Sequence, residues 1–247
     1  MNKIKTKILT ACLIVVAVLP LSACGGKKNA LDIIRESGVL RVAIIETGEP
    51  FARVTDGQPE GIEPQLVQQT AEALGVNAEY TVMDREAALD AVVSGEADLA
   101  MGGLSEQSGS SRGLLASLSY GKRFLYFVTN ADVYVNSASD FDAQTIGICG
   151  GINPETVETL TLSGNVQTLS FPDVSRAEES LTEGEIMGFF CYEDEAEKFL
   201  DDDSRLVQSL PFLVWEEYCA QALPENAELI SGFNVLIERQ LEAGGDQ

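Results

Sequence analysis

The stretch Ser94-Gly-Glu-Ala-Asp-Leu-Ala-Met-Gly-Gly-Leu-Ser105 joins the end of a predicted helix to a short strand and a glycine pair. The helix, over residues 86–93, is expected to stop at Ser94-Gly95, because glycine commonly follows a helix C-terminus. Residues 98–101 then form a strand candidate that runs into Gly102-Gly103. The stretch therefore predicts the last helix and strand of an α/β unit.

Residues on its N-terminal side complete that unit. They predict strands at 39–45 and 80–83, with a helix between them that begins at Gly61-Ile-Glu-Pro64 and ends at Gly75. The resulting βαβαβ order favours a parallel sheet with right-handed crossovers.

A second series with the same order follows. Gly184-Glu185 precedes its third strand as Gly95-Glu96 precedes that of the first series, so we expect two similar α/β lobes. Its strands are predicted at 145–149, 166–171 and 186–191, and its helices at 154–162 and 174–181. Further strands are predicted at 124–128, 212–215 and 218–223, and a helix at 228–241, which the sequence assigns to neither lobe.

The N-terminus has the pattern of a secretory signal. Three lysines precede an apolar run over residues 8–19, and small residues precede Cys24 in Leu21-Ser-Ala-Cys24. These four residues resemble a bacterial lipobox, so we expect residues 1–23 to be removed and Cys24 to carry lipid. An ordinary signal with an incidental cysteine is the alternative. Residues 24–30 are then expected to form a flexible tether to a membrane outside the cytoplasm.

Composition excludes several classes of function. Without residues 1–23, 39 acidic residues face 13 basic ones, a formal charge of −26, which disfavours nucleic acid as a partner. The chain has no histidine, so it cannot form a Ser-His-Asp triad, a Cys-His pair or a histidine metal site by itself. No CxxC spacing occurs. We therefore expect no metal and no cofactor.

Several ordered motifs resemble the family 3 extracellular solute-binding proteins, receptors of ABC importers for polar amino acids. The resemblance covers nearly all of residues 31–243. The motifs are Gly38-Val-Leu-Arg-Val42, Glu49-Pro-Phe51, Gly61-Ile-Glu-Pro-Gln-Leu66, Ser94 to Ser105 as quoted above, Arg112 with Leu118-Ser119, and Gly147-Ile-Cys-Gly-Gly151.

The resemblance implies a two-lobed α/β fold of the type II periplasmic-binding-protein kind, each lobe a mostly parallel sheet flanked by helices. Two hinge strands would join the lobes, and ligand would bind in the cleft between them. The implied boundaries are a first lobe at 31–121, a hinge at 122–126, a second lobe at 127–214, a hinge at 215–217 and a return to the first lobe at 218–247.

The resemblance also implies binding residues. Gly103 and Ser105 would meet a ligand carboxylate, and Arg112 would pair with it through its planar fork. Ile152 and Asn153 would direct backbone N–H groups into the cleft.

Four departures from the family pattern concern recognition. Arg112 follows Ser105 by two residues more than usual, Gly48 replaces a frequent aromatic residue, and Arg85 lies near another. Tyr192 stands where an acid usually holds the ligand's α-ammonium group, and it carries no charge at neutral pH. Either another acid replaces it, or the ligand lacks that ammonium group, and Arg85 could mark a second anionic group on the ligand. The replacements considered are Glu193, Glu49 and Glu217.

Cys149 and Cys191 end the first and third strands of the second series. Such strands are neighbours in a parallel sheet, so either a disulfide or two buried thiols would be ordinary outside the cytoplasm.

The sequence therefore predicts a non-enzymatic receptor, a lipid-anchored monomer that passes a small carboxylate-bearing solute to an ABC permease. A cyclohexadienyl-dehydratase-like enzyme on the same scaffold, and a tethered sensor with a decayed cleft, are the alternatives.

Overall fold

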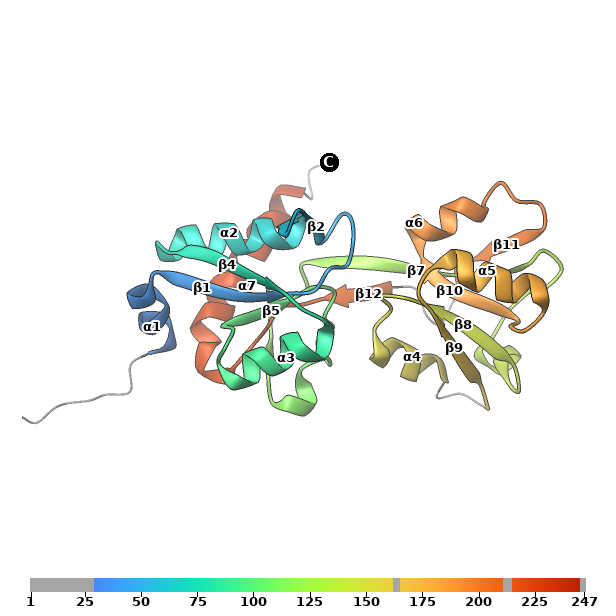
Figure 1. Ribbon diagram of the computed structural model, residues 1–247, viewed down its shortest axis with the longest axis horizontal. Coiled ribbons are helices and arrows are strands. Elements are labelled where there is room, and N and C mark those ends of the chain that lie inside the picture. The colour runs from blue at the N-terminus through green and yellow to red at the C-terminus, as the bar shows by residue number, and fades with distance from the viewer. Residues whose placement is uncertain (1–28, 162–164, 211–214, 245–247) are drawn as a thin grey trace, which may run out of the picture.

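The computed structural model describes residues 29–161, 165–210 and 215–244, which form two α/β lobes connected by two strands (Figure 1). The predicted signal segment and Cys24 lie outside these residues, as does most of the strand expected at 212–215.

The first lobe contains a five-stranded sheet in the order β4-β1-β5-β13-β6. The strands β1, β4 and β5 are parallel, and β13 runs antiparallel to β5 and β6. Its elements are α1 (Ala30–Ser37), β1 (Val39–Ile44), the hairpin β2 (Arg53–Thr55) and β3 (Gln58–Glu60), α2 (Ile62–Leu74), β4 (Asn77–Val82), α3 (Arg85–Ser94), β5 (Leu99–Met101), β6 (Leu115–Ala116), β13 (Gln221–Ala222) and α7 (Ala227–Gly244).

Capping residues determine where the helices begin and end. Asn29, which the sequence assigned to the tether, caps α1, and Asp84 caps α3 by accepting a hydrogen bond from the Ala87 N–H. Gly75 and Gly95 end α2 and α3 in the left-handed conformation, as glycine at these positions predicts.

The second lobe contains a sheet in the order β11-β7-β10-β8-β9. The strands β8, β9 and β10 are parallel, and β7 is antiparallel to β10 and β11. Its elements are β7 (Gly121–Asn130), β8 (Thr145–Cys149), α4 (Pro154–Thr161), β9 (Gln167–Phe171), α5 (Val174–Glu183), β10 (Gly188–Tyr192), α6 (Glu193–Ala196) and β11 (Arg205–Gln208).

Two strands pass between the lobes. β12 (Trp215–Tyr218) pairs antiparallel with the first half of β7, from Gly121 to Phe124, and the second half of β7 belongs to the second sheet. After β12 the chain returns to the first lobe, where Leu229, Ile230 and Phe233 of α7 are buried in one cluster with Leu66 and Val67 of α2. The packing of this apolar face thus assigns the last helix to the first lobe, which the local residue pattern left open and the family resemblance implied.

Cys149 and Cys191 lie on the neighbouring parallel strands β8 and β10, and both are buried free thiols. Neighbouring strands lie about 4.8 Å apart with side chains nearly parallel, whereas a disulfide requires Cβ atoms about 3.8 Å apart. The structure therefore does not contain the disulfide that the sequence left open. Burial raises the pKa of Cys149 to about 12 and that of Cys191 further, so both remain thiols.

Candidate functional site

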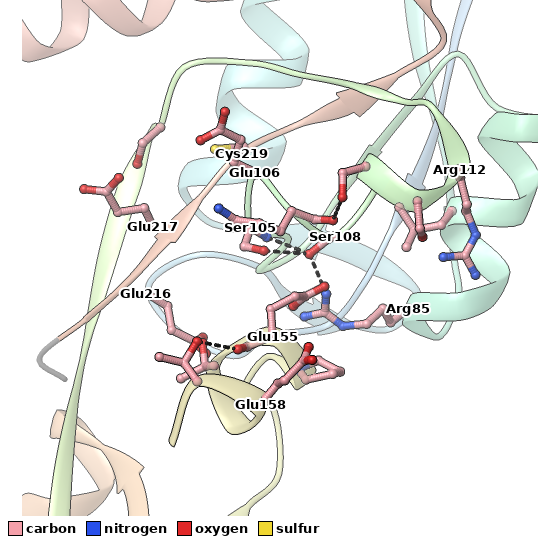
Figure 2. Close-up of a pocket in the computed structure, with 18 of the residues that line it drawn as sticks. Arg85, Ser105, Glu106, Ser108, Arg112, Glu155, Glu158, Glu216, Glu217 and Cys219 are labelled. Atoms are coloured by element: carbon pink, nitrogen blue, oxygen red, sulfur yellow. Dashed lines mark hydrogen bonds between the residues drawn. The ribbon is translucent and has the colours of Figure 1, made fainter. Parts of the chain in front are cut away.

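A cavity of about 1030 Å³ lies between the two lobes (Figure 2). One wall comes from the first lobe, namely the start of α3 and the segment 105–119. The other comes from α4 of the second lobe and from β12. Its charged lining residues are Arg85, Glu86, Glu106, Arg112, Glu155, Glu158, Glu216 and Glu217.

The first-lobe wall begins where β5 ends. Gly102 and Gly103 have φ values of 121° and 62°, and a Cβ atom at Gly102 would lie 2.4 Å from the Ile45 carbonyl oxygen. Only glycine at position 102 allows the loop after β5 to approach the loop after β1 this closely. The chain then turns so that the hydroxyl of Ser108 accepts from the Ser105 N–H at 2.9 Å and lies 3.0 Å from the Ser105 hydroxyl.

Arg85 is held against this loop from the first turn of α3. Its guanidinium donates to the Ser108 hydroxyl at 2.9 Å and to the Gly103 carbonyl oxygen at 3.1 Å. Among the residues that the structure describes, no carboxylate lies within ion-pair distance of it. A guanidinium has five N–H donors, so part of the Arg85 fork remains for an anion in the cavity.

Arg112 lines the same wall, but unlike Arg85 its guanidinium is paired with carboxylates. It ends a short 3₁₀ helix, Ser110–Arg112, and pairs with two carboxylates of α3, Glu86 and Asp90, the latter at 3.2 Å. The hydrogen bond to Glu86 is the largest of the effects that raise the pKa of Arg112. Two of its donors are therefore already in use within the lobe.

The facing wall is acidic. Figure 2 shows Glu155 and Glu158 of α4 opposite Arg85 and Ser108, with Glu216 beside them. Glu216 is 3% exposed. Its Oε1 accepts from the Asn153 N–H at 2.8 Å, and its Oε2 lies 2.7 Å from the Tyr192 hydroxyl oxygen. Burial raises the pKa of Glu216, while hydrogen bonds from Thr156, Tyr192 and Asn153 and the charge of Arg85 act in the opposite direction.

A buried carboxyl also supports the first-lobe loop from behind. Glu63 of α2 is fully buried and accepts hydrogen bonds from the Tyr120 hydroxyl and from the Gly103 N–H, the latter at 3.1 Å. Burial raises the pKa of Glu63 to about 7. The two backbone groups of Gly103 are thus bonded to Glu63 and Arg85.

Of the residues selected from the sequence, Arg85, Ser105, Arg112 and Glu217 line the cavity. The remaining ones lie elsewhere. The N–H of Asn153 is bound by Glu216, and Ile152 packs in the second-lobe core. Tyr192 is buried behind Glu216, and Glu49 pairs with Arg53 at a separate hollow on the first lobe. Glu193 is exposed on α6, 3.4 Å from the Tyr126 hydroxyl.

Sequence reasoning missed Ser108, Glu155 and Glu216. In β12, Glu216 and Tyr218 are buried while Trp215 and Glu217 are exposed, an alternation that the residue types of Trp215-Glu-Glu-Tyr218 do not show. No local pattern indicated that Glu216 would meet Asn153 and Tyr192.

Comparisons with known proteins identify the class. The chain matches the bacterial extracellular solute-binding proteins, family 3, over residues 40–241, and it belongs to that family. Among curated proteins, no relative matches at a significant level.

Solved structures agree with this class. The amino acid ABC transporter substrate-binding protein AbpA from Streptococcus pneumoniae, bound to L-arginine, is 25% identical with a TM-score of 0.65, over 86% of this chain and 93% of that one. The arginine-binding protein ArgBP from T. maritima in its holo form is 19% identical with a TM-score of 0.64, over 85% and 93%. An ancestral amino-acid-binding protein, AncCDT-1, a precursor of cyclohexadienyl dehydratase, is 19% identical with a TM-score of 0.66, over 88% and 95%.

The fold is therefore that of the amino-acid ABC transporter substrate-binding proteins, as the resemblance predicted. In the described part of the chain, no helix is long and apolar enough to cross a membrane, and no cluster of three potential metal ligands occurs.

Proposed function

We propose that this protein is the lipid-anchored, extracytoplasmic substrate-binding component of an ABC importer, and that it captures a small carboxylate-bearing solute, an amino acid or a close relative. The observation that carries the proposal is that both arginines lining the cavity lie on the first-lobe wall, beside Glu86 and Glu106, whereas the charged residues lining the facing wall are all carboxylates. Arg85, Ser105, Ser108 and Arg112 lie on one side of the cavity, and Glu155, Glu158, Glu216 and Glu217 lie on the other.

The first-lobe wall would receive the carboxylate. Guanidinium groups bind carboxylates through charge-assisted hydrogen bonds, and the Ser105 hydroxyl adds one donor beside Arg85, because the Ser108 hydroxyl, which accepts from Arg85 and the Ser105 N–H, donates to it. Arg112 also lines the wall, but it is already paired with Glu86 and Asp90. Closure of the second lobe over the solute would complete the site, and the monomer would then present it to the permease.

The identity of the solute is tested by mass spectrometry of the small molecules that co-purify with the protein, followed by a binding panel of amino acids. Trp215 is the single tryptophan of the chain and lines the cavity, so its fluorescence reports binding directly. The arginine-bound relative AbpA makes L-arginine the first member of the panel. Failure of every amino acid and related carboxylate to change the fluorescence or the melting temperature would contradict the proposal.

The anchor is tested separately, by fractionation of cells. Cys24→Ser is expected to release the protein from the membrane or leave its signal uncut, because acyl chains on Cys24 supply the membrane affinity. Cys12→Ser, within the signal's apolar run, is the matched control and is expected to be processed normally. Normal processing and retention of the Cys24→Ser variant would rule out the anchor.

A further inference from the structure

Glu216 is a buried carboxyl group whose surroundings lack a paired cation. It sits on the hinge strand β12 and lines the cavity, and its direct partners are the Asn153 N–H, the Thr156 side chain and the Tyr192 hydroxyl. Among the described residues, no lysine or arginine lies within ion-pair distance of it. An ionised carboxylate is costly to bury in such a place without a counter-ion.

The hydrogen-bond contacts of the Tyr192 hydroxyl indicate the protonation state of the Glu216 carboxyl group. The Tyr192 hydroxyl oxygen lies 2.7 Å from the Gly151 carbonyl oxygen, 2.7 Å from Glu216 Oε2 and 3.2 Å from the Tyr218 hydroxyl. A carbonyl carries no hydrogen, and the single hydrogen of the Tyr192 hydroxyl can serve only one of these two 2.7 Å contacts at a time. Tyr218 supplies the hydrogen of the third contact. Both 2.7 Å contacts are satisfied together when Tyr192 donates to Gly151 and Glu216 Oε2 itself carries a proton.

Other groups around the carboxyl are consistent with this state. Tyr192 and Tyr218 are buried, and burial raises the pKa of both, so neither supplies a negative charge. Arg123 of β7 lies 3.7 Å from the centre of the Tyr192 ring and is paired with Asp194, and Arg85 acts on Glu216 only through its charge.

We infer that Glu216 is a specificity-determining residue that is neutral in the empty cleft and ionises when the solute places an ammonium or guanidinium group beside it. The O–H bond of Glu216 breaks, the proton leaves to solvent, and the carboxylate pairs with the arriving cation. Tyr192 then turns its hydrogen from Gly151 to Glu216. The inference rests on the proposed function, because it names the chemical class of solute that this cleft selects.

The same geometry explains how the protein manages without an acid at position 192. The Tyr192 hydroxyl is hydrogen-bonded to the carboxyl group of Glu216 on the hinge strand. The acid that faces the cavity therefore comes from β12 instead of β10. Because β12 also connects the lobes, pairing at Glu216 would favour the closed arrangement.

Calorimetry of the intact protein tests the inference. The probe is the tightest binder among the twenty standard L-amino acids and agmatine, titrated at about pH 6 in phosphate and in a buffer of high ionisation enthalpy. We expect proton release approaching one per bound molecule, and an affinity that rises by up to about tenfold per pH unit while Glu216 remains protonated in the empty protein. Isotope-edited infrared spectra should lose a carboxylic-acid band on binding.

Glu216→Gln is the decisive variant, because an amide can donate to Tyr192 as the neutral acid does but cannot ionise. It should fold normally, release no proton and bind the probe about 10- to 100-fold more weakly, since a hydrogen bond to a charged group is lost. Glu183→Gln removes one exposed carboxylate from α5 of the second lobe, outside the cavity, and should behave as the parent.

The outcomes separate the two proposals. Tight binding by Glu216→Gln, or proton release that persists in this variant, would overturn the role of Glu216 while leaving the receptor function standing. Binding of the probe by the parent without proton release between about pH 5 and pH 8 would do the same. Absence of binding by every member of the panel would overturn the proposed function itself.

Discussion

The two walls of the cleft differ in their charged residues and in construction, since both arginines lie on the first-lobe wall and the facing wall carries only carboxylates. On the first lobe, arginines come from the start of α3 and from a 3₁₀ turn, and each is held by contacts within its own lobe. On the facing wall, the carboxyl of Glu216 comes from a strand that connects the lobes, and its contacts reach into α4 and β10. The side chains of the first wall are therefore held in place before the lobes close, whereas the position of Glu216 on the second wall depends on the position of the hinge strand β12.

Loss of the Arg85 side chain is expected to weaken solute binding more than any other change to either wall of the cleft. Arg85→Ala should weaken binding of the co-purifying solute by about 2–5 kcal/mol, or roughly 30- to several-thousand-fold, because it removes a guanidinium with unused donors. Arg112→Ala is the matched comparison and should cost less than about tenfold, since Arg112 is already paired with Glu86 and Asp90. Titration followed by Trp215 fluorescence measures both. A larger loss in Arg112→Ala would make that residue the principal clamp, as the sequence suggested.

The buried carboxyl behind the first wall should make stability depend on pH. The pKa of Glu63 is raised to about 7 in the folded protein, above its ordinary value of 4.5. The folded state thus holds a proton that the unfolded state has lost. The contribution of Glu63 is complete below about pH 4.5 and falls by at most about 3 kcal/mol as the pH rises through 7.

Urea unfolding at several pH values tests this dependence. Glu63→Gln should remove most of the slope between about pH 5 and pH 8, because an amide cannot ionise. Glu79→Gln, an exposed change on β4, should keep the slope of the parent. An unchanged slope in Glu63→Gln would place the titrating group elsewhere.

Removal of a helix N-cap should have a smaller effect, and its effect on solute binding should differ between the two lobes. Asp84 caps α3 through the Ala87 N–H at 2.9 Å, and Asp173 caps α5 through the Arg176 N–H at 3.0 Å. Either aspartate replaced by alanine should cost about 1 kcal/mol of stability. Only Asp84→Ala should also weaken binding, by about threefold to tenfold, because Arg85 occupies the first turn of α3. Equal binding by the two variants would show that the cap does not position Arg85.

The sequence by itself determined the elements and their order. Glycines at 75 and 95, Pro64 and the apolar runs placed both βαβαβ series within a few residues of their observed bounds, because helix ends and strand periodicity are local properties. The helix α1 was missed because Asn29 was assigned to the tether and not recognised as its cap.

The tertiary structure decided which side chains meet. Arg112 was selected for its spacing, yet its partners on α3 lie more than twenty residues away, and Arg85 reaches Ser108 across a similar separation. Glu216 meets Asn153 from 63 residues away and Tyr192 from 24. Such contacts are fixed by the packing of whole helices and strands and by the cost of burying charge. The local sequence around each residue determines neither the packing nor that cost, so it could not predict these contacts.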